Sequence, residues 1–310
     1  MVVADTDAAP LENPTTHRVL GPGVWLVVGV GAAAVGFLPW IITGMRLPLQ
    51  NLWDSPTPPE DMPIGLLPFS QYSITLIAGI LVVGSALAGL VARAAHRRRD
   101  RRRLLALVAG TLGVQVVAIA YTATVVGSGL RPGNESTIYL AAIVAVAVAS
   151  FATSTGVLFL VAVCPGAGAL IGLAVAAVAS GWWLDALVVP VPWAVSDTQV
   201  AILGVLHWAP AVLSGIAIAW CGVASAGRIV AAVATIAILV VGPAVATAVS
   251  SAAGTRVLAR YPAEMAGYAM QVFAQALTSS ELTLRPVVTA LVVAVIGLAV
   301  GGALRRGYSR

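Results

Sequence analysis

The sequence has too few charged residues to cover a water-facing surface. Charged residues make up 9% of the 310 residues and hydrophobic residues 59%, and the mean hydropathy is +0.97. A soluble domain carries roughly a quarter charged residues. These values exclude a soluble globular protein and predict a chain that is built into a membrane.

The motifs of common enzymes and metal sites are also missing. The sequence contains no HExxH, GxSxG or Walker A motif, and its two cysteines form no CxxC or Cys/His pair that would suggest zinc. His207 is the only histidine within an apolar stretch, which excludes a haem held between helices by two histidines. No cofactor is therefore expected, and any use of ATP would require a partner subunit.

Lysine is absent, and arginine supplies all seventeen basic residues. Together with the abundant Ala, Val and Gly, this usage is typical of GC-rich bacterial genomes. Six of the arginines fall within 97–103, interrupted only by Asp100. No aromatic residues alternate with this basic run, as binding of single-stranded nucleic acid would require. The run is therefore interpreted as an anchor beside the membrane, and no nucleic-acid partner is expected.

Eight apolar stretches are long enough to cross a bilayer as helices. A hydrocarbon core of about 30 Å needs roughly 20 apolar residues per helical span, and the alternation at period two that marks an outer-membrane barrel is absent. The sequence thus predicts an all-α, polytopic integral membrane protein of about eight transmembrane helices, although residues 138–184 can be divided in more than one way. The stretches are 23–44, 73–95, 104–127, 138–163, 167–184, 200–224, 229–251 and 286–304.

The arginines predict the orientation of these spans. The positive-inside rule places the basic loop 94–103 in the cytoplasm, and eight spans then put both the N-terminus and the C-terminus on that side. Twelve arginines fall on the inner side, and five fall outside. Carboxylates lean the other way, and Asp185 and Glu281 are among those expected outside. The outer arginines are Arg46, Arg131, Arg256, Arg260 and Arg285.

The first twenty residues differ from the rest of the chain. Residues 1–20 are polar and are predicted to be a disordered cytoplasmic tail. The stretch that follows is longer than the core of a signal peptide, and no small-residue cleavage site comes after it, so it is predicted to remain as an anchor. Residues 21–310 are then a single transmembrane domain, in contact with lipid as a multi-pass protein of the inner (plasma) membrane.

Two outer segments are long enough to have structure of their own. The loop 45–72 is rich in proline, which favours a stiff extended chain, and its Trp53 and Phe69 are expected at the level of the lipid headgroups. In 257–279, apolar residues recur at steps of three and four, which predicts an amphipathic helix. This helix is expected to lie on the outer surface or to fold over the bundle, either as a passive interfacial helix or as a lid.

Candidate ligand-binding residues are the polar and aromatic side chains within the spans. His207 and Trp208 precede Pro210, which can kink a helix and free a backbone carbonyl. Gln115 and Tyr121 lie in the third stretch. Each of these side chains can equally serve as a hydrogen-bonded link between helices. No carboxylate falls in the middle of a stretch, which argues against a conventional ion-coupled carrier.

Three functions are compatible with these features. The leading hypothesis is a permease, or the membrane subunit of an exporter, that moves a small or lipid-like solute with a partner ATPase or another membrane protein. The alternative is a non-catalytic scaffold or regulator in a cell-envelope or division complex. An enzyme that acts on lipid-linked substrates, with Asp54 as its outer carboxylate, is the third hypothesis, and the protein is not expected to be an enzyme.

Overall fold

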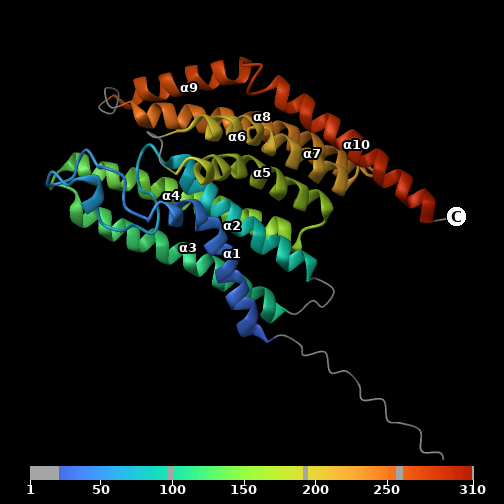
Figure 1. Cartoon of the computed structure of the whole chain (residues 1–310), viewed down its shortest axis with the longest axis horizontal. Coiled ribbons are helices and arrows are strands. Elements are labelled where there is room, and N and C mark those ends of the chain that lie inside the picture. The colour runs from blue at the N-terminus through green and yellow to red at the C-terminus, as the bar shows by residue number, and fades with distance from the viewer. Residues whose placement is uncertain (1–20, 96–100, 191–194, 256–260, 309–310) are drawn as a thin grey trace, which may run out of the picture.

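The chain folds into a bundle of helices that run approximately along one axis (Figure 1). The computed structural model describes residues 21–95, 101–190, 195–255 and 261–308, and within these residues no β-strand is formed. The elements are α1 (Pro22–Ile42), the 3-10 helix η1 (Pro59–Asp61), α2 (Ile74–Ala94), α3 (Arg101–Gly129), α4 (Asn134–Val163), α5 (Gly166–Val188), α6 (Asp197–Leu206), α7 (Ala209–Cys221), α8 (Ala226–Gly254), α9 (Pro262–Thr278) and α10 (Leu284–Tyr308).

The predicted number of membrane spans is confirmed. Eight segments of the described chain are long and apolar enough to cross a bilayer: α1, α2, α3, α4, α5, the α6–α7 segment, α8, and residues 284–304 of α10. The stretch 138–184 divides into two helices, because Cys164 and Pro165 separate α4 from α5. The predicted tail 1–20 and residues 96–100 of the basic loop lie outside the described residues.

The first four helices are held together by close backbone contacts and one buried polar link. α1 packs against α3, and α2 packs against α4. Gly29 of α1 and Gly110 of α3 lie where the first pair crosses, and a Cβ on Gly110 would lie 2.3 Å from the carbonyl oxygen of Leu26. Only a residue without a side chain allows this approach, so the two glycines set the spacing of α1 and α3.

The loop 45–72 closes one end of these four helices, which we call the outer end. Phe69 is fully buried in the main hydrophobic cluster, so its predicted place among the lipid headgroups is wrong. Trp40 Nε1 donates a hydrogen bond to the Gly65 carbonyl at 2.8 Å, and the Leu67 N–H donates to Thr122 Oγ1 at 3.0 Å. The loop is therefore a fixed cap, because its backbone is bonded to α1 and α3.

The second half of the chain is packed less tightly than the first. α7 and α10 form one close pair, and α8 packs against α5 and α9. α9 runs back along the outer part of α8 rather than across the end of the bundle (Figure 1). The predicted amphipathic segment 257–279 is a helix from residue 262 to residue 278, and it lies along the side of the bundle against α8, while residues 256–260 lie outside the described residues.

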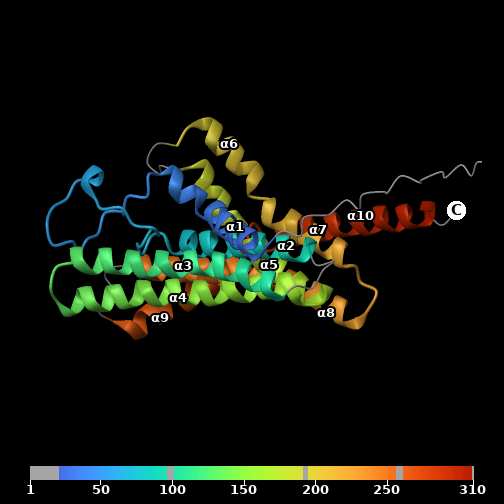
Figure 2. The same cartoon turned by 90° about the horizontal axis from the view of Figure 1, so that it is seen from below.

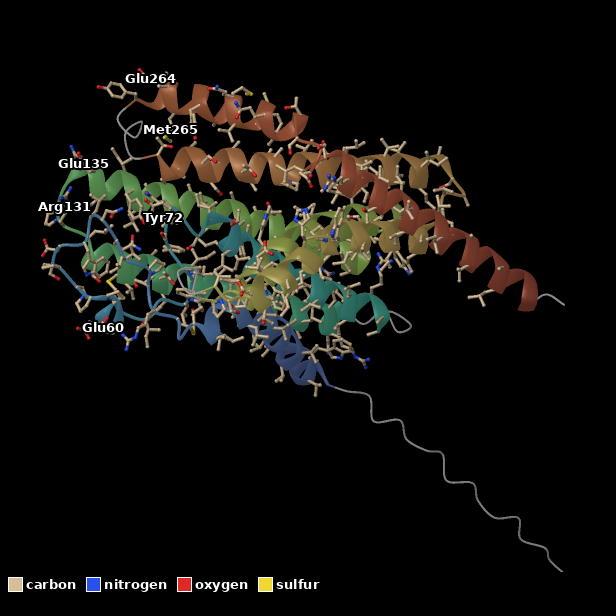
Figure 3. The ribbon with its side chains drawn as sticks, turned by 45° about the horizontal axis from the view of Figure 1, so that its top comes forward. Glu60, Tyr72, Arg131, Glu135, Glu264 and Met265 are labelled. Atoms are coloured by element: carbon tan, nitrogen blue, oxygen red, sulfur yellow. The ribbon has the colours of Figure 1, made fainter. Side chains whose placement is uncertain are left out.

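Charged side chains gather at the outer end. Figure 3 shows Glu60, Arg131, Glu135 and Glu264 at the end of the bundle that carries the cap. Arg131 lies just before α4 and Glu135 lies in its first turn, and the two form an exposed ion pair at 3.3 Å. Such a surface suits contact with water or headgroups, because these charges need not enter hydrocarbon.

Candidate functional site

The sixth span is interrupted where His207 and Trp208 separate α6 from α7. Pro210 contributes to the interruption, since it has no N–H to bond the Leu206 carbonyl and its ring crowds the preceding turn. The chain passes this point by a tighter turn, in which the Trp208 N–H donates to the Val205 carbonyl at 3.2 Å. The break leaves backbone polar groups without regular helical partners inside an apolar span.

The interruption is pressed against α5. A Cβ on Gly181 would lie 2.9 Å from Cγ of Pro210, so a glycine is required at this contact. Gly181 is seven residues from Val188, which places the contact about 10 Å short of the outer end of α5. Trp183 holds the same part of α5 to α1, because its Nε1 donates to the Gly36 carbonyl at 2.8 Å.

Asp185 lies one helical turn beyond Gly181 on α5, and His207 lies three residues before Pro210, so the Gly181–Pro210 contact places the two residues on neighbouring turns. Both side chains are exposed on the surface of the bundle, and no direct hydrogen bond joins them among the described residues. The rings of His207 and Trp208 meet edge to face, with their centroids 5.5 Å apart and their planes at 80°. An acid, an imidazole and an indole are therefore placed together at the interrupted helix.

The fifth helix is longer than the predicted stretch, and Asp185 lies within the helix rather than after its end. The fifth stretch was expected to end at residue 184, but the helix continues through the apolar residues after Asp185 to Val188. Asp185 thus lies on the last turn of α5, four residues beyond the contact of Gly181 with Pro210. The continuation of the helix past Asp185 was hard to predict, since a single aspartate near the end of an apolar stretch usually marks the end of the helix.

α6 stands apart from the rest of the bundle (Figure 2). It has no buried residue, and Val205 on its surface is 72% exposed. Its start is fixed by a capping box between Ser196 and Gln199, and Gln199 Nε2 donates to the Val188 carbonyl at 2.7 Å. α6 is therefore attached at both ends but not held along its length.

A second interruption separates α9 from α10. Pro286 lies in the first turn of α10, where its missing N–H is tolerated but a continuous helix from α9 is not. Glu281 and Arg285 form an ion pair at 2.8 Å in this corner, and both side chains are 58% exposed. The corner therefore carries charge beside apolar helices.

The corner between α9 and α10 does not lie at the end of the bundle. Ala290 of α10 packs in one cluster with Leu239 of α8. Leu284 is six residues before Ala290, or about 9 Å, whereas Gly254 at the end of α8 is fifteen residues from Leu239, or about 22 Å. The corner is thus about 13 Å short of the outer end of α8, as Figures 1 and 3 also show.

Gln115 lies elsewhere, at the centre of the first four helices. It is fully buried, and its Nε2 donates to the Leu81 carbonyl at 2.9 Å and to Ser85 Oγ at 3.1 Å. Its Oε1 accepts a hydrogen bond from Ser154 Oγ at 2.9 Å. These bonds join α3 to α2 and α4 and use the polar atoms of the amide, which favours a role in packing over ligand binding.

Tyr121 is also separate from the interrupted helices. It lies on α3 and is 45% exposed on the outside of the bundle. α3 packs against α1, α2 and α4, and its main contacts do not include α6 or α7. The structure therefore brings together His207 and Trp208 with Asp185, and it does not bring Gln115 or Tyr121 to them.

Comparison with known proteins adds no identification. No protein-family model matches the chain, and neither the curated proteins nor the solved structures give a significant match. Within the described residues, no group of three or more His, Cys, Asp or Glu side chains is placed to hold a metal ion.

Proposed function

We propose that the protein is a membrane permease, or the membrane subunit of an exporter, that moves a small or lipid-like solute. The interrupted sixth span supports this proposal most directly. Its break lies within a candidate membrane span, carries His207 and Trp208, and is packed against α5 at Gly181, one helical turn from Asp185. Discontinuous helices are a common source of solute sites in transporters, because their free backbone groups and half-helix ends lie inside the membrane.

The mobility that transport needs is also supported by the packing. α6 buries no side chain, so a change in its angle at Pro210 loses little packing energy. α7 is held firmly by α10, since a Cβ on Gly215 would lie 2.6 Å from the Ala290 carbonyl oxygen. A movable outer half-helix on a fixed inner half-helix is suited to open and close a path from one side.

The exporter version of the proposal adds a partner ATPase. The chain has no nucleotide-binding motif of its own, and the basic loop 94–103 offers a charged contact on the predicted cytoplasmic side. No catalytic step belongs to this proposal. A variant Asp54→Ala is expected to keep full activity, and its loss of activity would favour the lipid-linked enzyme instead.

The proposal is tested by the access of water to the interruption. In a protein with Cys164→Ser and Cys221→Ala, we introduce His207→Cys or, as the lipid-facing control, Val233→Cys on α8, where the native side chain is 66% exposed. A charged methanethiosulfonate reagent reacts only with thiols that water reaches. A pathway predicts fast modification at residue 207 and slow modification at residue 233.

Equal, slow modification of both cysteines would contradict a solute pathway at this site. It would favour the second candidate, a non-catalytic scaffold or regulator in a cell-envelope or division complex. That alternative is supported by α10, which carries exposed apolar side chains such as Val295 and Ile296 that another membrane helix could cover. Stable co-purification with another membrane protein, together with the absence of any transport defect in a deletion strain, would support the scaffold.

A further inference from the structure

We propose that Arg93, Trp220 and Arg228 form a binding site for an anionic phospholipid at the inner end of the bundle, opposite the cap. The two guanidinium groups bind the phosphate of the lipid headgroup, and an exposed face of α7 contacts an acyl chain. The site lies on the predicted cytoplasmic side. It does not depend on the proposed transport, because its ligand is a lipid of the surrounding leaflet rather than a transported solute.

Arg93 is fixed in position by the end of α4. It lies in the last turn of α2, where its Nε donates to the Val161 carbonyl at 2.5 Å and its Nη2 donates to the Cys164 carbonyl. Both carbonyls belong to the C-terminal end of α4, where regular helical donors are missing. A guanidinium has five N–H groups. Two of them are used by these bonds within the described residues, so the others remain for a further acceptor.

Trp220 connects this arginine to α7. The guanidinium carbon of Arg93 lies 5.5 Å from the centre of the Trp220 ring, within the range of a cation–π interaction. The inner ends of α2 and α7 thus lie together at the end of the bundle opposite the cap (Figure 1). Trp220 is nevertheless 53% exposed. Tryptophan is favoured at the level of the headgroups, so its exposed part is placed where a lipid headgroup meets the protein.

Arg228 brings a second guanidinium to the same end of α7. A Cβ on Gly222 would lie 3.9 Å from Nη1 of Arg228, so this side chain folds back over the turn between α7 and α8. Gly222 is two residues from Trp220, and two residues span at most about 7 Å. Arg228 is exposed and forms no ion pair within the part of the chain that the structure describes. Its charge is therefore available to a ligand beside Trp220.

The charge at this end of the bundle selects a negative ligand. The described carboxylates all belong to the cap, to the outer ends of α4, α5 and α6, or to α9 and its corner with α10. The first turn of α8 contains no acid, and Ser225 before it makes no side-chain cap. Arg228 adds to the partial positive charge of this helix end. A phosphate between the two arginines would reduce the repulsion between these positive groups.

The apolar surface next to the arginines favours a lipid over a soluble anion. Leu213, Ile216 and Trp220 follow one another at steps of three and four, which places them on one face of α7. All three side chains are exposed. An acyl chain can therefore lie along this face while the phosphate of the same lipid contacts Arg93 and Arg228.

Quenching of Trp220 by brominated lipid measures the binding. The full-length protein is placed in nanodiscs of phosphatidylcholine that contain a small fraction of lipid with brominated acyl chains. The emission of Trp220 is obtained as the difference between the wild type and Trp220→Phe. Brominated phosphatidylglycerol should quench this emission at a several-fold lower mole fraction than brominated phosphatidylcholine does. Equal quenching by the two lipids would overturn the proposal.

Arg228→Gln should reduce the preference for phosphatidylglycerol by about fivefold, the effect typical of one basic residue at a membrane surface. Arg228→Lys keeps the charge and should retain most of the preference. The matched control is Arg101→Gln, which removes an exposed arginine at the same end of the bundle from α3, whose main contacts do not include α7 or α8. This control should leave the preference unchanged. An equal loss in Arg101→Gln and Arg228→Gln would show a general attraction of anionic lipid to the basic surface, and it would refute a defined site.

Inorganic phosphate separates a lipid site from a site for a soluble anion. Added to the same nanodiscs, it should displace brominated phosphatidylglycerol no better than sodium chloride of equal ionic strength, because it has no acyl chain to contact α7. Displacement beyond this salt effect would assign the two arginines to a soluble phosphate ligand and would contradict the lipid site.

Discussion

Replacement of Gln115 by leucine is expected to lower the stability of the first four helices without changing their fold. The side chain is fully buried and takes part in three hydrogen bonds, to the Leu81 carbonyl, to Ser85 and from Ser154. Leucine has a similar volume and suits an apolar interior, so packing alone would make the substitution nearly neutral. The loss of the hydrogen bonds therefore decides that the substitution lowers the free energy of unfolding.

The magnitude follows from the number of bonds that are lost. Hydrogen bonds between membrane helices contribute about 0.6 kcal/mol each on average. Three bonds then give a loss of about 2 kcal/mol for Gln115→Leu. Ser154→Ala removes one of the three bonds to the amide and should lose only about 0.6 kcal/mol. The double variant should show a coupling of similar size, since the bond it removes is shared.

The assay is reversible unfolding by SDS in mixed micelles, followed by tryptophan fluorescence. The matched control is Gln271→Leu on α9, where the same change is made at an exposed position. It should shift the midpoint little, because no intramolecular bond of this side chain is lost. A Gln115→Leu protein as stable as the wild type, or a Gln271→Leu protein that loses as much, would refute the reasoning that the buried amide links the helices.

Three further changes test other parts of the structure. Gly110→Ala should cost about 1–3 kcal/mol, because its Cβ would clash with the Leu26 carbonyl oxygen, whereas Gly113→Ala on the same helix meets open space and should gain up to about 1 kcal/mol in the same unfolding assay. His207→Ala should impair complementation of a deletion strain more than it lowers the amount of protein in the membrane; equal losses would indicate a packing role. Cysteines introduced at positions 58 and 133 should be labelled from outside intact cells and one at 100 should not, and labelling at 100 would overturn the predicted orientation.

The number of helices could be predicted because the bilayer imposes a strong constraint on composition. An apolar stretch of sufficient length has few other structures available in lipid, since its backbone must be hydrogen-bonded internally. The stretches 73–95 and 229–251, for example, correspond to α2 and α8 within a few residues. The same constraint says nothing about which helices touch, because lipid and protein surfaces are equally apolar.

Contacts between helices were accordingly harder to predict. Gly168 and Gly172 have the four-residue spacing typical of close helix contacts, and a Cβ on Gly172 would lie 2.9 Å from Val161 of α4. Another close crossing joins Gly29 to the region of Gly110. These glycines are spaced four residues from Ala33 and Ala106, but the chain has so many Ala and Gly residues that such spacing does not single out one contact.

Only part of the candidate site could be predicted from the sequence, for a related reason. His207 and Trp208 stand out within an apolar stretch, and the proline after them marks a possible break. Asp185 did not stand out, because hydropathy treats an aspartate as the end of a span. His207 is twenty-two residues farther along the chain, and the packing of Pro210 against Gly181 brings the two positions close together.

Proline alone does not decide where these helices break. Pro39 and Pro243 lie inside α1 and α8, which continue past them, while Pro210 ends α6. α8 has buried residues on both sides of its proline, Leu239 before it and Ala244 after it, and their packing favours a continuous helix across the proline.

α6 has no buried residue, so nothing on its outer side compensates for the hydrogen bond that Pro210 removes. The interruption of the sixth span is therefore a consequence of missing tertiary contacts as much as of the proline. It follows that added packing should repair it. A larger apolar side chain at a half-buried position of α6, such as Leu203→Phe, should reduce the mobility of a spin label on Val205→Cys even though Pro210 remains, and unchanged mobility would show that the proline acts alone.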